Sequence, residues 1–269
     1  MSTYLFLKWA HIIAMAYWLG GEWGVFNASR PITDTSLTLD ERKRHMETAY
    51  RIDILPRTGI ILLLPLGLHM GAIYNYQPLH GPWITGMWVF VAAWLSITYS
   101  AFFYRGTDRG VMLTRIDELI RYVVIPLLIG FGIYSLVTGW PFTQNWYAAK
   151  ATLYGVALII GLLLRFIMRH WVMLFRQIAA GPNPEAEARL DRELALGRGL
   201  AYVYWIVIAS VAFFGVFKPR VFRRNVLRQL ALFYNPFGGI FVGGCDVFFA
   251  DAKIIRDCLQ KFFGLGRCC

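Results

Sequence analysis

The sequence predicts an all-α protein, a polytopic bundle of six transmembrane helices. Of its 269 residues, 57% are hydrophobic and 16% are aromatic, whereas soluble domains contain about 45–50% apolar residues. A membrane-spanning helix needs about 20 mostly apolar residues. Runs of about this length occur at residues 4–26, 54–75, 83–104, 122–139, 147–168 and 200–217. None alternates between apolar and polar residues as barrel strands do, so residues 1–217 are expected to form one helical membrane domain.

Local signals support the first three runs. No Ala-x-Ala-like cleavage site follows residues 4–26, so this run predicts a retained helix rather than a signal peptide. Pro65 lies inside the second run, where neighbouring helices can satisfy the freed carbonyl, and we expect a kink there. Trp83 opens the third run, where an aromatic side chain marks the membrane interface.

The last three runs are delimited in the same way. Pro126 predicts a kink in the fourth run. Trp140 and Trp146 bracket the turn before the fifth run and fit an aromatic belt at the membrane surface. The sixth run is preceded by PNPEAEARLDRELALGRGL, which predicts a short polar helix after a Pro-rich turn.

Positive charges collect on one side of the predicted bundle. Arg and Lys are abundant between the first and second runs, the third and fourth, and the fifth and sixth, whereas the other side has only Lys8 and Lys150 before residue 218. By the positive-inside rule the basic loops are cytoplasmic and the amino terminus lies outside, as in a protein of the bacterial inner membrane. The net charge of +11 is therefore a topology signal. Attraction to anionic membrane lipid is a second reading, and nucleic-acid binding is not indicated.

Residues 218–269 form a basic tail that breaks this pattern. Lys218 and the arginines after it lie on the nominally outer side, against the charge rule. A surface-lying amphipathic segment, a misread last helix and a segment foreign to the fold are all open, and residues 230–250 would make a weak seventh element. All four cysteines lie in this tail, at spacings unlike those of a metal site: Cys245, Cys258, Cys268 and Cys269.

Two histidines lie inside the first two runs, where ionisable side chains are rare and mark functional sites. His11 is about 10 Å below Tyr4 and His69 is about 9 Å before Asn75, at 1.5 Å rise per residue. Both imidazoles are therefore expected at one depth on neighbouring antiparallel helices. Two neutral imidazoles so placed can ligate a b-type haem. We predict haem b, with His11 and His69 as its iron ligands.

Small residues near these histidines would leave room for the macrocycle. Gly67 and Gly71 flank His69, and Ala14 lies beside His11. Small residues also allow close helix packing. Two other readings of the histidines are open, a polar packing or proton-handling pair and a site for a different metal.

A second polar pair is predicted toward the inner end of the same helices. Glu22 lies near the end of the first run and Arg57 at the start of the second, and we expect a structural ion pair because buried charges must be paired. A role in proton entry is the alternative. Asp117 and Glu118 are expected at a solvated helix entrance. The sequence has no Walker-type loop, HExxH zinc motif or dinucleotide fingerprint.

The first run resembles the first helix of two groups of bacterial membrane proteins, those related to copper-resistance protein D and the HemJ type of protoporphyrinogen oxidase. The matching stretch is LKWAHIIAMAYWLGGEWGVF, with His11, Trp18, Gly20 and Gly21, and more loosely RIDILPRTGIILLLPLG. The resemblance implies a multi-helix inner-membrane protein, and several members of these families are treated as b-type haem proteins. The oxidase pattern also includes a membrane lysine in a later helix, and residues 83–104 and 122–139 contain none.

Together these features predict an integral membrane protein similar to a b-type cytochrome. One haem near the outer face would pass electrons between a quinone or a membrane dehydrogenase and an outer-side partner, so the chain would serve an oxidoreductase. A haem-independent transporter or metal-import component, with the same histidines along its pathway, is the first alternative. A membrane enzyme of tetrapyrrole oxidation is the second.

Overall fold

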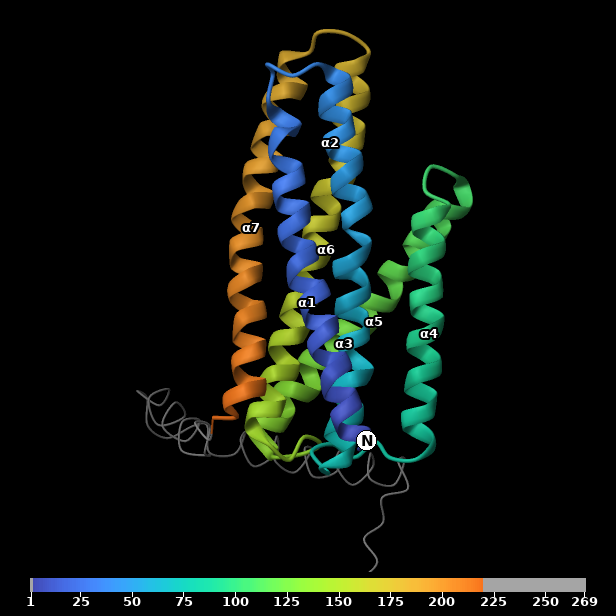
Figure 1. Cartoon of the computed structure of the whole chain (residues 1–269), viewed down its shortest axis with the longest axis vertical. Coiled ribbons are helices and arrows are strands. Elements are labelled where there is room, and N and C mark those ends of the chain that lie inside the picture. The colour runs from blue at the N-terminus through green and yellow to red at the C-terminus, as the bar shows by residue number, and fades with distance from the viewer. Residues whose placement is uncertain (1, 220–269) are drawn as a thin grey trace, which may run out of the picture.

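The computed structural model describes residues 2–219, and they form an all-α bundle without strands (Figure 1). The all-α prediction is confirmed. Seven α-helices and one short 3-10 helix follow one another along the described chain: α1 (Thr3–Ser29), η1 (Arg30–Thr33), α2 (Leu39–Ile52), α3 (Ile54–Ile73), α4 (Pro82–Phe103), α5 (Asp108–Thr138), α6 (Asn145–Ala179) and α7 (Pro184–Phe217). The predicted seventh element and the four cysteines lie outside the described residues.

Several of these helices can cross a membrane, so the chain is a multi-pass membrane protein. Among residues 2–219, five helical segments are long and apolar enough: α2 with α3, then α4, α5, α6 and α7. The first predicted span forms α1, which has 27 residues. It is not one of the five, and Lys8, His11 and Glu22 lower its mean hydropathy.

The helices α1, α3, α6 and α7 run side by side along the length of the molecule, and α4 stands apart from α1 and α7 (Figure 1). Helix α4 packs mainly on α5 and α3. The pair α1 and α3 is in backbone contact, since a Cβ at Gly59 would collide with the carbonyl of Ala14 and the backbone of Trp18. A Cβ at Gly21 would likewise collide with Pro56. Small residues at such crossings are typical of membrane helices.

One end of the bundle extends beyond the length that a membrane requires. Helix α6 has 35 residues, and 35 residues rise about 52 Å at 1.5 Å each, against about 30 Å for the hydrocarbon core. The segment before the sixth predicted span is not a separate short helix. It is continuous with that span in α7, because Leu190 and Leu194 are buried and hold it against α6.

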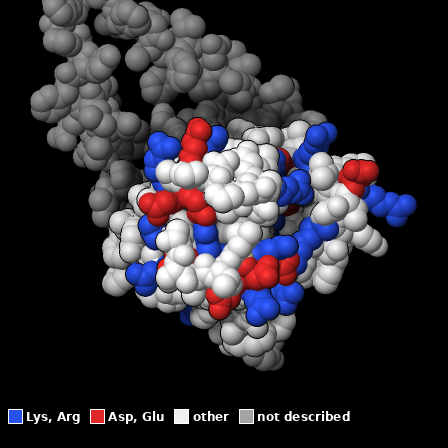
Figure 2. All heavy atoms as spheres, turned by 90° about the horizontal axis from the view of Figure 1, so that it is seen from above, with Lys and Arg blue, Asp and Glu red and all other residues white. Residues whose placement is uncertain are grey.

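Helix α2, which the sequence analysis did not anticipate, completes this extension. Thr38 and Glu41 form a capping box at its start, and Arg42 makes a double ion pair with Glu187 of α7 at 2.6 and 2.8 Å. Figure 2 shows this end of the molecule, where Lys, Arg, Asp and Glu side chains gather. We call it the basic end, and the opposite end, where α1 begins, the N-terminal end (Figure 1).

A buried aromatic layer crosses the bundle between the two ends. Trp18 donates a hydrogen bond from Nε1 to Tyr204 Oη at 3.0 Å, and its ring meets the rings of Tyr154 and Tyr204 edge-on. Tyr154 donates to the carbonyl of Ile60. All three aromatic side chains are buried. This middle layer separates two cavities, one toward each end of the bundle.

Candidate functional site

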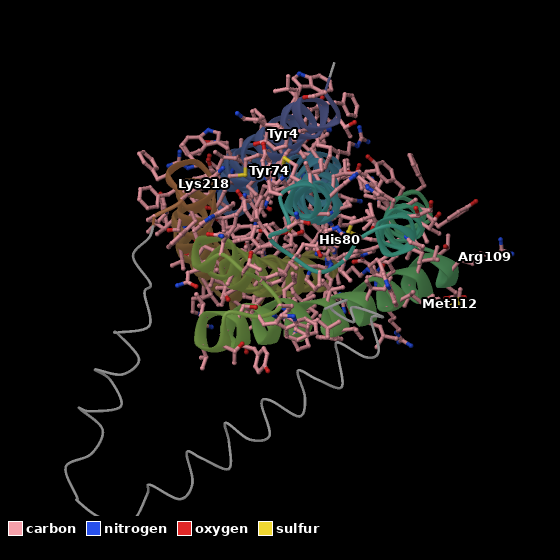
Figure 3. All side chains as sticks on the ribbon, turned by 90° about the horizontal axis from the view of Figure 1, so that it is seen from below. Tyr4, Tyr74, His80, Arg109, Met112 and Lys218 are labelled. Carbon is pink, nitrogen blue, oxygen red and sulfur yellow. The ribbon has the colours of Figure 1, made fainter. Side chains whose placement is uncertain are left out.

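A cavity of about 320 Å³ lies between α1, α3, α6 and α7 at the N-terminal end. Tyr4, Tyr74 and Lys218 are at this end of the molecule, as the view in Figure 3 shows, and all three line the cavity. Its walls are mostly apolar, and its floor is formed by Tyr154 of the middle layer. We call it the N-terminal cavity.

His11 and Lys150 meet in this cavity, although 139 positions separate them in the sequence. Lys150 Nζ is 3.5 Å from His11 Nε2, at the long limit of a hydrogen bond. The other ring nitrogen, Nδ1, is buried and has no hydrogen-bond partner among the described residues. Buried polar atoms are nearly always paired, so this nitrogen is a candidate to hydrogen-bond a ligand of the cavity.

Glycines shape the wall of the cavity on both sides of this pair. Gly67 lies against the His11 ring, and its carbonyl accepts a hydrogen bond of 3.2 Å from Tyr147 Oη. Gly71 lies against the same tyrosine hydroxyl, where a Cβ would collide. On the other side, a Cβ at Gly215 would be 2.9 Å from Lys150 Nζ, so the absence of a side chain in α7 leaves room for the ammonium group.

The charge of the N-terminal cavity has one sign. Lys8, Lys150 and Lys218 line it, and none of the residues of 2–219 in its lining is Asp or Glu. Lys218 also lies over the ring of Trp146, 5.4 Å from its centroid. Because the lysines have no carboxylate to neutralise them, the cavity is complementary to an anion that is otherwise apolar.

His69 does not face this cavity. It lines a separate apolar groove between α1, α3 and α4, together with Ala14. Its Nδ1 accepts a hydrogen bond of 3.3 Å from Trp88 Nε1, because an indole nitrogen can only donate. The predicted pairing of His11 with His69 is therefore corrected: the partner of His11 is Lys150, and that of His69 is Trp88.

The direction in which side chains leave α3 explains why His69 does not face His11. His11 lies against Gly67, which is two positions before His69. The two histidines therefore do lie at similar heights in the bundle, as their positions in the sequence predicted. Two positions along a helix turn the side chain by about 200°, however, which sends it to the opposite face. Gly67 and Gly71 are four positions apart and share the face toward His11 and α6, while His69 points away from it.

The residues present do not fit a bis-histidine haem. The iron would need both imidazoles in one space, and His11 and His69 occupy different cavities on either side of the pair α1 and α3. Of the predicted haem-site residues, Gly67 and Gly71 line the cavity of His11, and Ala14 lies on the side of His69. Within residues 2–219, no group of three or more His, Cys, Asp and Glu side chains could hold a metal ion.

The predicted ion pair between Glu22 and Arg57 is also corrected. Arg57 pairs with Asp53, one turn earlier in the chain. Glu22 and Arg57 both line the cavity toward the basic end, but Glu22 makes no ion pair within the described part of the chain. The sequence placed the two charges at one level correctly, yet a carboxylate four positions away on the same helix face lies closer than one on the neighbouring helix.

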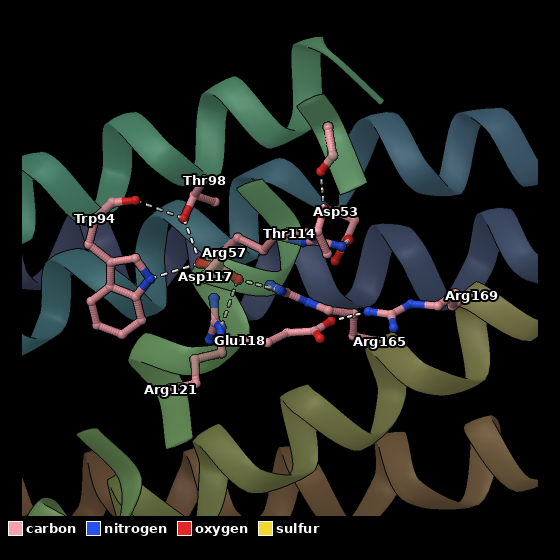
Figure 4. A network of polar contacts seen from close by, with 11 residues as sticks. Asp53, Arg57, Trp94, Thr98, Thr114, Asp117, Glu118, Arg121, Arg165 and Arg169 are labelled. Carbon is pink, nitrogen blue, oxygen red and sulfur yellow. Dashed lines mark hydrogen bonds and ion pairs between the residues drawn. The ribbon is translucent and has the colours of Figure 1, made fainter. Parts of the chain in front are cut away.

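Asp117 is the centre of a buried polar network rather than part of a solvated helix entrance (Figure 4). Its side chain accepts hydrogen bonds from Trp94 Nε1 and Thr98 Oγ1, both at 2.8 Å. It also pairs with Arg121 at 3.2 Å and with Arg165. Asp117 is 1% exposed. The network ties α4, α5 and α6 together near the basic end.

Glu118 belongs to the same region. It pairs with Arg169 of α6 and is itself buried (Figure 4).

Lys150 was not predicted as a site residue, although the sequence contains a signal for it. Lys150 stands near the start of a long apolar run, and an ionisable side chain in such a run is by default a functional candidate. It was read only as a loop charge. Arg165 gave a similar signal, because it lies inside the run 147–168 and is buried in the structure.

Comparison of the chain with known protein families, with characterised proteins and with solved structures gives no match.

Proposed function

We propose that the chain is a membrane enzyme that binds a carboxylated tetrapyrrole in the N-terminal cavity and oxidises it. The observation that supports this best is the pairing of His11 with Lys150 in an apolar cavity whose lining, as far as the chain is described, contains lysines and no acidic side chain. A lysine in a later membrane helix is also part of the pattern of the HemJ type of protoporphyrinogen oxidase, which the first run resembles, although residues 83–104 and 122–139 contain none and Lys150 lies in the next helix.

The ligand class follows from the walls of the cavity. Aromatic and aliphatic side chains suit a large flat apolar ring system. Carboxylates on that ring would pair with Lys8 and Lys218 near the mouth or with Lys150 inside, since charge-assisted hydrogen bonds are the strong ones in an apolar site. A cavity lined by lysines repels metal cations, which argues against metal import.

The proposed reaction removes hydrogen from the ring in two-electron steps. Each step takes two electrons and two protons from the tetrapyrrole, and a membrane quinone that accepts both becomes a quinol. His11 and Lys150 are the groups in the cavity that can take up and pass on a proton. With the basic end in the cytoplasm of a bacterial cell, as the positive-inside rule predicts, the reaction occurs in the outer half of the inner membrane.

Titration of the purified full chain with protoporphyrin, followed by the porphyrin fluorescence, tests the binding step. Lys150→Met removes one charge-assisted hydrogen bond, which contributes about 1.5–3 kcal/mol, and affinity should fall roughly 10- to 100-fold. Lys43→Met is the matched control, because Lys43 is exposed on α2 and far from the cavity. Equal affinity of both variants and the parent chain would contradict the proposal.

The chemical step needs a second measurement. Protoporphyrinogen and a short-chain quinone are supplied to the protein in detergent, and formation of porphyrin is followed above the uncatalysed rate. His11→Gln should abolish the protein-dependent rate, because it removes the titratable ring while the amide side chain still fills part of the space. A parent protein that binds porphyrin without any quinone-dependent oxidation would reduce the function to tetrapyrrole binding.

A further inference from the structure

A second cavity lies on the other side of the middle layer, toward the basic end. Its volume is about 70 Å³, and α1, α3, α5, α6 and α7 line it. Four arginines and two carboxylates contribute to the lining: Arg57, Arg121, Arg165, Arg198, Glu22 and Asp53. We call it the arginine cleft.

The guanidinium groups of the cleft have more donors than the neighbouring carboxylates can accept. An arginine carries five N–H donors. Arg57 bonds to Asp53 through one nitrogen, and Arg121 and Arg165 share the single carboxylate of Asp117. The three arginines also lie close enough for Arg57 and Arg121 to repel Arg165 electrostatically.

Three of the lining residues carry polar atoms without a partner. Arg121 is 3% exposed, and its Nη2 has no hydrogen-bond partner in the described chain. Trp171 Nε1 is a second such buried donor. Arg198 is half-buried on α7 and makes no ion pair or side-chain hydrogen bond with any residue of 2–219. A buried donor left unpaired is costly, more so when it is charged, so these atoms indicate an acceptor that residues 2–219 do not supply.

We propose that the arginine cleft binds a phosphate group. Guanidinium groups match phosphate oxygens with two parallel hydrogen bonds. An anion placed among Arg121, Arg165 and Arg198 would offset the repulsion of Arg165 by Arg57 and Arg121. The volume equals that of roughly two water molecules at about 30 Å³ each, which limits the ligand to a small group. The phosphate can be inorganic or belong to a phospholipid headgroup, and the site is independent of the proposed tetrapyrrole reaction.

Glu22 is the internal competitor for this site. It lines the cleft and has no ion-pair partner within the described residues, so its carboxylate, whenever it is ionised, opposes a bound anion. Replacing it by glutamine keeps the size of the side chain and removes the charge. If the cleft binds phosphate, Glu22→Gln should tighten binding at a pH high enough to ionise Glu22 in the parent chain. If Glu22 only contributes to packing, the substitution should change Tm by the same amount with and without phosphate.

Thermal unfolding of the delipidated full chain in detergent tests the proposal. Sodium phosphate is added at constant ionic strength against sodium chloride, and in a second series the probe is phosphatidic acid with short acyl chains. A saturable rise in Tm with either probe supports the site and identifies the source of the phosphate. Arg198→Gln should lose most of the rise, and Lys43→Gln, on the exposed face of α2, should keep it.

Glu22→Gln should reach half of the rise at a lower phosphate concentration than the parent chain does. It also provides a test that leaves every arginine in place, should Arg198→Gln fail to fold. No rise with either probe, or an equal rise in Arg198→Gln, would overturn the proposal and leave a cleft that holds water alone.

Discussion

Both cavities of the bundle are lined by positively charged side chains, but they differ in whether carboxylates pair with those charges. In the N-terminal cavity, Lys8, Lys150 and Lys218 have no carboxylate beside them among the lining residues of the described chain. Near the arginine cleft, Asp117 and Asp53 are already bound to guanidinium groups. A buried charge without a partner raises the free energy of the folded protein. Under the proposed function the lysines are kept for a ligand, whereas Arg57, Arg121 and Arg165 are held by carboxylates and stabilise the fold.

The middle layer allows the two regions to be perturbed separately. Trp18, Tyr154 and Tyr204 are buried between them and bonded to each other or to the backbone. Substitutions that share no partner and lie more than about 7–10 Å apart have additive effects on the free energy of unfolding. Variants on either side of the layer should therefore report on their own cavity.

The largest effect is expected at the buried network. Asp117→Ala leaves Arg121 and Arg165 without their shared carboxylate and removes the acceptor of two further hydrogen bonds. Breaking a buried ion pair from one side costs about 3–5 kcal/mol. We expect a loss of this order in the free energy of unfolding, measured by denaturant titration in detergent with tryptophan fluorescence.

Lys150→Met is the comparison variant for Asp117→Ala. Lys150 is half-buried without a carboxylate, so removing its charge should leave stability unchanged or raise it. A strong destabilisation by Lys150→Met, equal to that of Asp117→Ala, would show that both regions are structural and would remove the basis of the comparison.

A moderate effect is expected at the glycine wall of the N-terminal cavity. In Gly71→Ala the added Cβ collides with the hydroxyl of Tyr147, which is bonded to the carbonyl of Gly67. Overpacking of this kind costs about 1–3 kcal/mol, and porphyrin affinity should fall as Tyr147 is displaced. Gly67→Ala is the control, because its Cβ would be 3.7 Å from His11, an ordinary contact.

An alanine at position 67 should in fact be neutral or slightly stabilising, because glycine in a helix is less favourable than alanine by about 0.5–1 kcal/mol. Thermal unfolding and porphyrin titration of the two variants side by side measure both effects. An equal loss of stability in Gly67→Ala and Gly71→Ala would contradict this prediction, because it would show that the contact with Tyr147 is not what distinguishes the two positions.

The smallest effect is expected at His69. His69→Phe removes the acceptor of the Trp88 hydrogen bond, and a neutral hydrogen bond contributes about 0.5–1.5 kcal/mol. Porphyrin binding should stay unchanged, since His69 lies in another cavity than His11. A dithionite-reduced spectrum with the band of a bis-histidine haem, lost in variants of His11 and of His69 alike, would restore the histidine pair.

Much of the fold was predictable from local properties of the sequence. Each apolar run coincides with a helix, because a helix that crosses lipid must satisfy its own backbone over about 20 residues. The bounds agree closely for α1, α3 and α4, whereas α5, α6 and α7 each extend well beyond their runs at one end. The helix α2 and the long extension of α6 and α7 were not predicted, since they are amphipathic and are held by contacts such as that of Arg42 with Glu187. The candidate site was half predictable: His11, Gly67 and Gly71 were named, and Lys150 was not.

By itself, then, the sequence determined that the chain is helical, that it belongs in a membrane and which positions along it carry charge into an apolar setting. Only the tertiary structure decided which charges meet. His11 faces Lys150 rather than His69, and Asp117 faces Arg165 rather than water. The physical reason is that residue spacing fixes height along a helix, whereas the rotation of each helix about its axis depends on how all of its neighbours pack.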